Sequence, residues 1–264
     1  MAVKALLAAK SGPHYDHQRD AMCALADGMG LCGIEARVKS APASPRPDDD
    51  FVVTWGDKEV PHSRVPHLIL ECGYINGSGD NYNENRMRFI SASWNKRHGL
   101  SDWAWPKEIC GERWNAFGVE LKPWKLTGEY VLLLEQHVGD RAAPDVGKFR
   151  RDIKRECERR QWTFHRRPHP SYYRNERTLA EDLSNALFAV TWCSTAAVEA
   201  VIAGVPTYTL GPGSIAAPVT RPLLSDEPYV GDRTTWANRL AYRQWTMEEL
   251  ADGTAWPHIQ RGLG

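Results

Sequence analysis

Short apolar runs alternate with longer amphipathic stretches along the chain, and this alternation constrains the fold more than any other feature. The runs predict strands at residues 3–9, 34–38, 51–55, 67–72, 129–136, 162–167, 186–192 and 206–210. Helical periodicity predicts helices at 16–30, 145–160, 178–185, 194–204 and 238–253. Because helices of this length connect parallel strands, the pattern predicts parallel βαβ units.

The alternation breaks down once, over residues 76–128, where five of the 11 tryptophans lie between Trp94 and Trp124. We expect loops and short elements there, and a domain boundary near Lys122 to Gly128. The predicted fold is therefore α/β, with two Rossmann-like halves at 1–124 and 125–264 and a cleft between them. Two halves of this size suit a chain of 264 residues. The carboxyl ends of parallel strands collect ligands in such a cleft.

Composition places the chain among globular proteins, since 42% of the residues are hydrophobic and 25% are charged. No apolar run reaches the roughly 20 residues that span a bilayer. The first ten residues lack the basic and apolar regions of a signal peptide, so we expect them to form a core strand. The six cysteines form no C-x-x-C pair, which predicts neither disulfides nor a zinc site. We therefore expect a cytoplasmic protein without a membrane span.

Charge is balanced over the whole chain but not along it. The formal net charge is zero, so no overall field attracts nucleic acid. Residues 146–177 nevertheless hold 11 Lys or Arg against four Asp or Glu. This basic stretch indicates either a phosphate-binding surface or the solvated face of a helix.

A pair of hydroxyls stands where the strand at 186–192 turns into the next helix. Ser194 and Thr195 occupy the helix start, and Ala197 and Val198 stand where a capping box needs Glu or Gln. The helix amides and the two hydroxyls are therefore suited to bind a phosphate, and Glu199, one turn later, to bind a ribose. The alternative is an ordinary capped helix of the core.

A histidine between two prolines follows the strand at 162–167. His169 lies between Pro168 and Pro170, which stiffen the backbone and fix the direction of the imidazole. An imidazole there can donate to a phosphate or a carboxylate, and Arg166 and Arg167 add positive charge. The alternative is a surface-loop histidine.

Polar residues follow two further buried strands. Gln136 and Asp140 come after the strongest apolar run, and Glu71 ends the strand at 67–72. Asp140 could act as a nucleophile or base, Gln136 could position a substrate, and Glu71 could serve as acid or base from the other half. The alternative for the first pair is ordinary loop polarity.

Together these stretches resemble the capsule-polysaccharide type of glycosyltransferase, which includes the retaining Kdo transferases. The matching motifs are Q-x-x-x-D at 136–140, H-P at 169–170, S-T with a following Glu at 194–199, and G-x-P at 204–206. The resemblance covers about residues 128–210 and implies a GT-B-like pair of Rossmann halves, with the acceptor bound by 1–124 and the nucleotide-sugar by 125–264. Thr195 stands where a second Ser is common, and it still offers a hydroxyl.

The resemblance also implies a role for each motif residue. Asp140 would act at the anomeric carbon, either as the nucleophile of a double displacement or as a base, with Glu71 as acid or base and Gln136 beside them. The nucleotide-sugar would be the co-substrate, with no further cofactor. Its binding residues would be His169, Pro170, Arg167, Ser194, Thr195 and Glu199.

The first half also resembles small predicted glycosyltransferases of bacteriophages, through stretches such as SWNKRHGLSDW at 93–103 and QWTMEEL at 244–250. This looser likeness indicates a hydroxymethylated base of phage DNA as the acceptor, in the host cytoplasm. Trp94, Lys96 and Arg97 would stack on and hold that acceptor. A saccharide or lipid acceptor is the alternative.

Other functions stay open at this stage. A nucleotide-sugar epimerase would need no acceptor, and a binding module would hold a nucleotide or sugar without turnover. The chain has no G-x-x-x-x-G-K-[S/T] loop, which disfavours a P-loop kinase. It has no D-x-D pair at the end of a strand, so we predict a metal-independent reaction with no bound metal.

Overall fold

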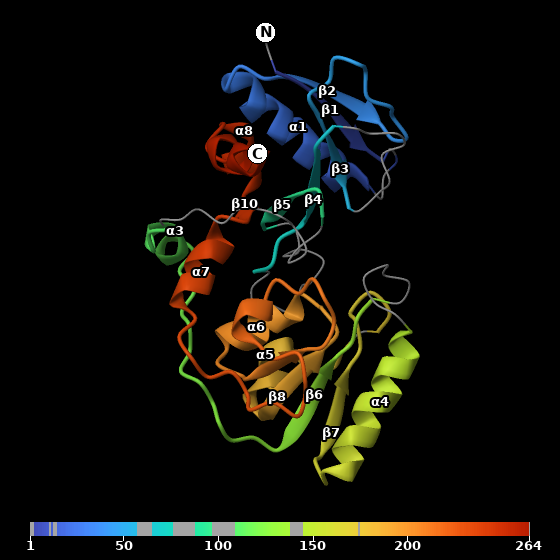
Figure 1. Cartoon of the computed structure of the whole chain (residues 1–264), viewed down its shortest axis with the longest axis vertical. Helices are drawn as coiled ribbons and strands as arrows, with labels where there is room; N and C mark the ends of the chain where they lie inside the picture. Colours follow the sequence, from blue (N-terminus) through green and yellow to red (C-terminus); the bar gives the residue numbers. More distant parts are fainter. Residues whose placement is uncertain are drawn as a thin grey trace.

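Two β-sheets with the same arrangement of parallel strands organise the computed structural model, which describes residues 3–10, 12, 15–56, 65–75, 88–96, 109–137, 145–173 and 175–263 (Figure 1). The first sheet has the order β10-β5-β4-β3-β1-β2 and the second the order β7-β6-β8-β9. Each contains four parallel strands. Numbered along the chain, they lie in the order second, first, third, fourth. The predicted α/β fold with two Rossmann-like halves is confirmed.

The first half follows the predicted elements closely. Its elements are β1 (Lys4–Ala9), α1 (Asp16–Leu31), β2 (Glu35–Ser40), β3 (Phe51–Trp55), β4 (His67–Cys72), β5 (Ile90–Trp94) and α3 (Glu112–Ala116). The strand β5 runs antiparallel to β4, which the alternation did not predict.

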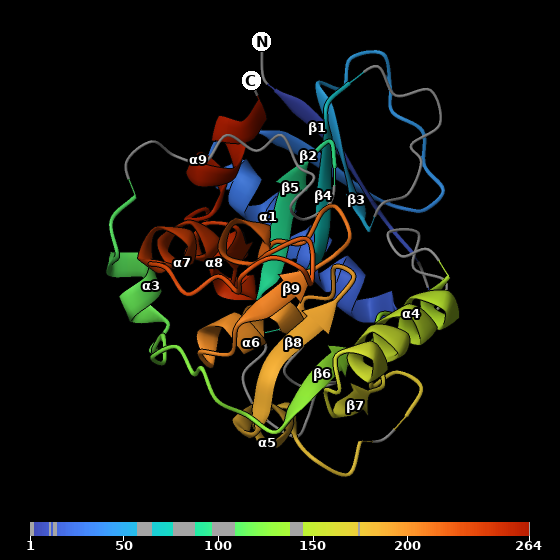
Figure 2. The same ribbon diagram turned by 60° about the horizontal axis from the view of Figure 1, so that its bottom comes forward.

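The second half repeats the alternation of strands and helices. Its elements are β6 (Tyr130–Leu134), α4 (Val146–Arg159), β7 (Phe164–Arg167), α5 (Leu179–Ser184), β8 (Ala186–Thr191), α6 (Ala196–Ile202), β9 (Thr207–Thr209), the 3-10 helix η3 (Ala217–Val219) and α7 (Thr234–Ala241). The side chains of β6 alternate between two cores. Val131 and Leu133 pack with α4, whereas Leu132 and Leu134 pack with residues of α5 and α6 (Figure 2).

The C-terminal segment returns to the first sheet. It consists of β10 (Gln244–Trp245), α8 (Met247–Ala251), α9 (Trp256–Ile259) and the 3-10 helix η4 (Gln260–Leu263). β10 pairs antiparallel with β5, and Leu250 and Trp256 lie in the same core as α1 (Figure 1). The division at residue 124 stays a prediction. It places residues 244–263 in the second half, and the structure packs them on the first sheet.

Helix α6 also takes part in the contact between the halves. Tyr74, Ile75 and Phe89, which flank the carboxyl end of β4 and the start of β5, share a core with Val198 and Val201 of α6. The edge of the first sheet where β4 ends therefore faces the second half.

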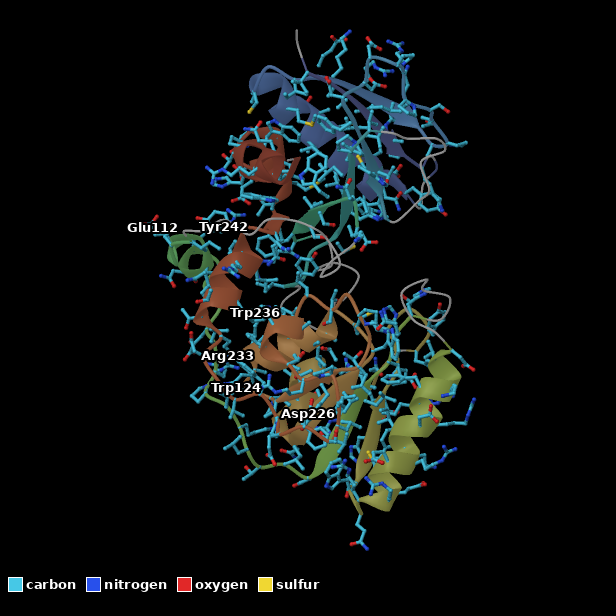
Figure 3. All side chains as sticks on the ribbon, in the orientation of Figure 1. Glu112, Trp124, Asp226, Arg233, Trp236 and Tyr242 are labelled. Atoms are coloured by element: carbon cyan, nitrogen blue, oxygen red, sulfur yellow. The ribbon has the colours of Figure 1, made fainter. Side chains whose placement is uncertain are left out.

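The chain that links the halves is fastened to the end of α6. Arg233 is buried, donates to the carbonyl oxygens of Val201 and Lys122, and lies 3.9 Å from the ring centroid of Trp124 (Figure 3). Burial lowers the pKa of Arg233. Gly204 has φ +77° beside this linker, a conformation that favours glycine.

No helix of the described residues is long and apolar enough to cross a membrane.

Candidate functional site

The candidate site lies where β6, β7 and β8 end. The chain leaves β6 toward β7 on one side and later enters β8 on the other, so the strand order reverses between β6 and β8. Open α/β sheets bind ligands outside the carboxyl ends of the strands at such a reversal. The residues that follow these three strands carry the predicted motifs, except Asp140, which lies outside the described residues.

Gln136 connects the end of β6 to the loop that follows β8. The backbone N–H of Cys193 donates to Oε1 of Gln136 at 3.4 Å. Thr191 strengthens the same connection, since its Oγ1 donates to the carbonyl oxygen of Leu134 at 2.9 Å and accepts from the N–H of Ser194 at 3.2 Å. The structure therefore brings Gln136 and the Ser194 loop together.

Within the described residues, the start of helix α6 has no capping box, as the sequence predicts. Thr195 is the N-cap residue, and in the described structure it makes no side-chain capping hydrogen bond. The Ser194 hydroxyl accepts from the N–H of Ala196 at 3.3 Å. Ser194, Thr195 and Glu199 are partly exposed, so a ligand can reach this end of the helix.

Two histidines and a tyrosine gather where β6 and β7 end. The rings of His137 and His169 are perpendicular, with centroids 5.2 Å apart. The Tyr172 hydroxyl lies 2.9 Å from Nε2 and 3.1 Å from Nδ1 of His137. We did not predict His137 or Tyr172, although both stand inside the motif-bearing stretches, at 129–140 and 165–173.

A buried carboxylate follows β6 directly. Glu135 accepts from Nε of Arg166 at 2.6 Å and from Nη1 of Arg150 at 3.3 Å. The hydrogen bond to Glu135 raises the pKa of Arg166. Arg167 donates instead to Asp182 and to the carbonyl oxygen of Arg177. These pairs hold β7 in place, and nucleotide binding by Arg167 stays a prediction.

The basic stretch forms ion pairs along its own helix. Glu156 accepts from Arg159 and Arg160, and these hydrogen bonds lower its pKa to about 2. Further pairs within α4 are Lys148–Asp152, Arg155–Asp152 and Lys154–Glu158. The structure therefore favours the solvated helix face over a phosphate-binding surface for residues 146–160.

Glu71 lies on the edge of the first sheet that faces the second half. It stands near the end of β4, and its Oε1 would be 3.5 Å from a Cβ atom added to Gly56, which follows β3. This placement suits a group that acts on a substrate held between the halves. Its role as acid or base stays a prediction.

The predicted acceptor residues lie elsewhere. Trp94 is 1% exposed, packs edge-on against Phe51, and donates through Nε1 to the carbonyl oxygen of Ile259 at 2.7 Å. Because a buried ring cannot stack on an acceptor, the assignment of Trp94 was wrong. Lys96 is exposed but follows β5 next to His67, the first residue of β4. It therefore lies at the sheet edge away from the second half, and Arg97 falls outside the described residues.

Metal ligands were not expected. Among the described residues, no group of three or more His, Cys, Asp or Glu side chains is placed to hold a metal ion. Whether the reaction needs a metal stays a prediction.

Two solved structures from Thermosulfurimonas dismutans share the fold. One is KpsC, beta Kdo 2,7 transferase, with a TM-score of 0.60, 13% identity, and coverage of 96% of this chain and 98% of that chain. The other is KpsC, beta Kdo 2,4 transferase, with a TM-score of 0.57, 14% identity, and coverage of 89% and 88%. At these identities the likeness shows a shared fold, and it confirms the predicted GT-B-like architecture.

Other comparisons add little. The UDP-GlcNAc 2-epimerase of Methanocaldococcus jannaschii aligns over 91% of this chain and 98% of that chain, at 10% identity and a TM-score of 0.33, which is too low to bear on function. No protein-family model matches the sequence, and neither does any curated protein.

Proposed function

We propose that the chain is a glycosyltransferase that uses a nucleotide-sugar donor and needs no metal. The observation that carries this proposal is that Gln136, the Ser194–Thr195 loop and His169 follow the carboxyl ends of the adjacent strands β6, β8 and β7. Gln136 binds the loop after β8, and its neighbour His137 packs on His169. This occurs in a fold shared along nearly its whole length with two Kdo transferases. Hydroxyls, helix amides and an imidazole are suited to hold the phosphate of a nucleotide.

The remaining roles follow the motif resemblance. Asp140 would act at the anomeric carbon, Glu71 would serve as acid or base from the first half, and Glu199 would hold the ribose. In a double displacement the Asp140 carboxylate forms a bond to the anomeric carbon as the nucleotide leaves, and the acceptor hydroxyl then displaces that carboxylate.

We propose a saccharide as the acceptor in preference to a hydroxymethylated DNA base. Four cations of α4 pair with carboxylates of the same helix, and the net charge of the chain is zero; the four are Lys148, Lys154, Arg155 and Arg159. Binding to duplex DNA depends mainly on Lys and Arg contacts to phosphates. A saccharide acceptor needs no such surface.

The first test follows the melting temperature of the protein with CMP, UDP, GDP and ADP. A nucleotide at 100 times its Kd stabilises the native state by about 2.7 kcal/mol, which for a chain of this size corresponds to a rise of roughly 5–10 °C. We expect His169→Ala and Ser194→Ala to reduce the rise by about half or more, the effect of a tenfold or greater loss of affinity. His165→Ala is the matched control. His165 lies on β7, the strand that leads to His169, but its ring stacks on Tyr130, away from the motif loops. A protein that responds to none of the four nucleotides would refute the proposal.

The second test separates catalysis from binding. Asp140→Asn should retain the nucleotide response and lose sugar transfer, whereas a binding module would show no transfer in either protein. Offering saccharide acceptors and hydroxymethylated DNA to the same enzyme distinguishes the acceptors. Transfer to DNA alone would overturn the choice of a saccharide.

A further inference from the structure

The dipeptide Gln136–His137 contacts the loops on both sides of the central strand β6. The Gln136 side chain binds the loop after β8, through the N–H of Cys193. The His137 side chain contacts the loop after β7, through Tyr172 and His169. Residues that leave one central strand therefore hold both neighbouring loops of the candidate site.

The His169 loop forms a tight turn that fixes the tautomer of its imidazole. The N–H of Tyr172 donates to the carbonyl oxygen of His169 at 3.1 Å. The N–H of Ser171 donates to Nδ1 of His169 at 3.2 Å. Because Nδ1 is an acceptor, a neutral His169 carries its proton on Nε2 and is a hydrogen-bond donor there.

Side chains packed against the imidazole add to the hold of the turn. His137 meets His169 edge to face, and the Tyr172 ring packs beside both, with its centroid 4.8 Å from that of His137 and 6.2 Å from that of His169. Tyr172 is 47% exposed, so its hydroxyl is not needed to fill the core.

We propose that His137 and Tyr172 are positioning residues, which hold the His169 imidazole so that its Nε2–H donates to the phosphate of the nucleotide. This inference rests on the proposed function. It adds two residues that the motifs do not specify, since His137 occupies an x position of Q-x-x-x-D and Tyr172 follows the H-P pair. It predicts that both act through His169 and not by direct contact with the nucleotide.

A double-mutant cycle tests this dependence. The probe is whichever of CMP, UDP, GDP and ADP raises the melting temperature of the wild-type protein most, with its Kd measured by calorimetry. We expect His137→Ala to weaken binding about 5- to 10-fold, the loss typical of one hydrogen-bonding contact. In a His169→Ala background the same substitution should change Kd less than about 2-fold.

The conservative variants sharpen the test. His137→Gln keeps a polar group within reach of the Tyr172 hydroxyl and should recover most of the affinity. Tyr172→Phe removes only that hydroxyl and should weaken binding, whereas Tyr173→Phe, a neighbour that packs with Arg166, should not. The melting temperature of each unliganded variant should stay within about 2 °C of wild type, because these are partly exposed loop residues.

The outcomes distinguish this inference from the proposed function. A wild-type protein that binds no nucleotide refutes both. If His169→Ala weakens binding while His137→Ala and Tyr172→Phe bind like wild type, the proposed function stands and the positioning role is wrong. Equal losses in both backgrounds would also overturn it, since they would mean that His137 contacts the nucleotide independently.

Discussion

Ending the chain at residue 242 should unfold the first half, although the removed segment lies more than 100 residues beyond the predicted boundary. The segment supplies β10, which pairs with β5, and the helices α8 and α9, which pack on α1. Without it the apolar face of the first sheet loses part of its cover, and Trp94 loses the carbonyl oxygen to which it donates.

The magnitude follows from four side chains that the segment buries. Trp245, Leu250, Trp256 and Ile259 are each at most 2% exposed. Burying an apolar side chain of this size stabilises the folded state by roughly 1.5–3 kcal/mol, so the four together contribute about 6–12 kcal/mol. This is comparable to the whole stability of a typical domain, about 5–15 kcal/mol.

The assay compares urea unfolding of the full chain with that of the chain ending at residue 242. We expect the shortened protein to lose the part of the transition that belongs to the first half and to show a smaller m-value. A chain ending at residue 260 is the matched control, because it keeps the four buried side chains and should unfold like the full protein. Trp256→Ala should by itself cost about 3–5 kcal/mol.

One result would refute this reasoning. If the chain ending at residue 242 unfolds with the midpoint and m-value of the full chain, the C-terminal segment does not stabilise the first sheet. The 1–124 division would then describe an independent folding unit.

Two further predictions concern single residues. Gly204→Ala should destabilise by about 2–5 kcal/mol, because Gly204 has φ +77° and the new Cβ would lie 2.1 Å from a backbone oxygen of the linker. Gly30→Ala, with no atom within 4 Å of its Cβ, should be neutral or stabilise α1 by about 0.5–1 kcal/mol in urea unfolding, and equal losses at both sites would contradict this. For Glu249, burial acts to raise the pKa, but hydrogen bonds, above all from Arg113, outweigh it and lower the pKa. A carboxylate with a lowered pKa stabilises the folded state above its unfolded pKa of about 4.3. The difference in free energy of unfolding between wild type and Glu249→Gln should therefore be full at pH 7 and shrink on acidification below about pH 4. A constant difference from pH 7 to about 3 would exclude this.

Many element types could be predicted from the sequence because strands such as β3, β4, β6 and β8 are short apolar runs and the long helix α4 has an apolar stripe. Ile153 and Cys157 of α4 are buried as that periodicity requires. Strand partners could not be predicted in the same way. β10 has only two residues, and nothing in its local sequence shows that it pairs with β5, about 150 residues earlier.

The same limit explains the error over the acceptor residues. Trp94 lies in a run of small and polar residues that looks like a loop, yet it is the last residue of β5, and that strand runs opposite to β4. Because β5 runs opposite to β4, the residues that follow β5 lie at the end of the sheet where β4 begins. Local pattern determines which side chains alternate, but only tertiary pairing determines the edge at which a strand ends.

The site was more predictable, since its backbone positions follow from strand ends alone. Gln136, His169 and Ser194 each follow a strand of one parallel sheet, and parallel strands end at one edge. His137 and Tyr172 were missed because their importance comes from a contact between two loops. A histidine after a motif glutamine carries no local signal that it faces a second histidine from β7.

The charges of the two halves fit their proposed roles, in which the second half binds the donor and the first half binds the acceptor. At the ends of β6, β7 and β8 the buried carboxylate of Glu135 is matched by two arginines. The other motif groups described there are imidazoles, hydroxyls and amides, with the carboxylate of Glu199 one turn into α6. Such an edge offers hydrogen-bond donors to a nucleotide phosphate. The edge of the first sheet that faces it carries the carboxylate of Glu71, a group suited to exchange a proton with an acceptor hydroxyl. An anionic donor held by the second half and a neutral saccharide held by the first would each meet the chemistry that it needs.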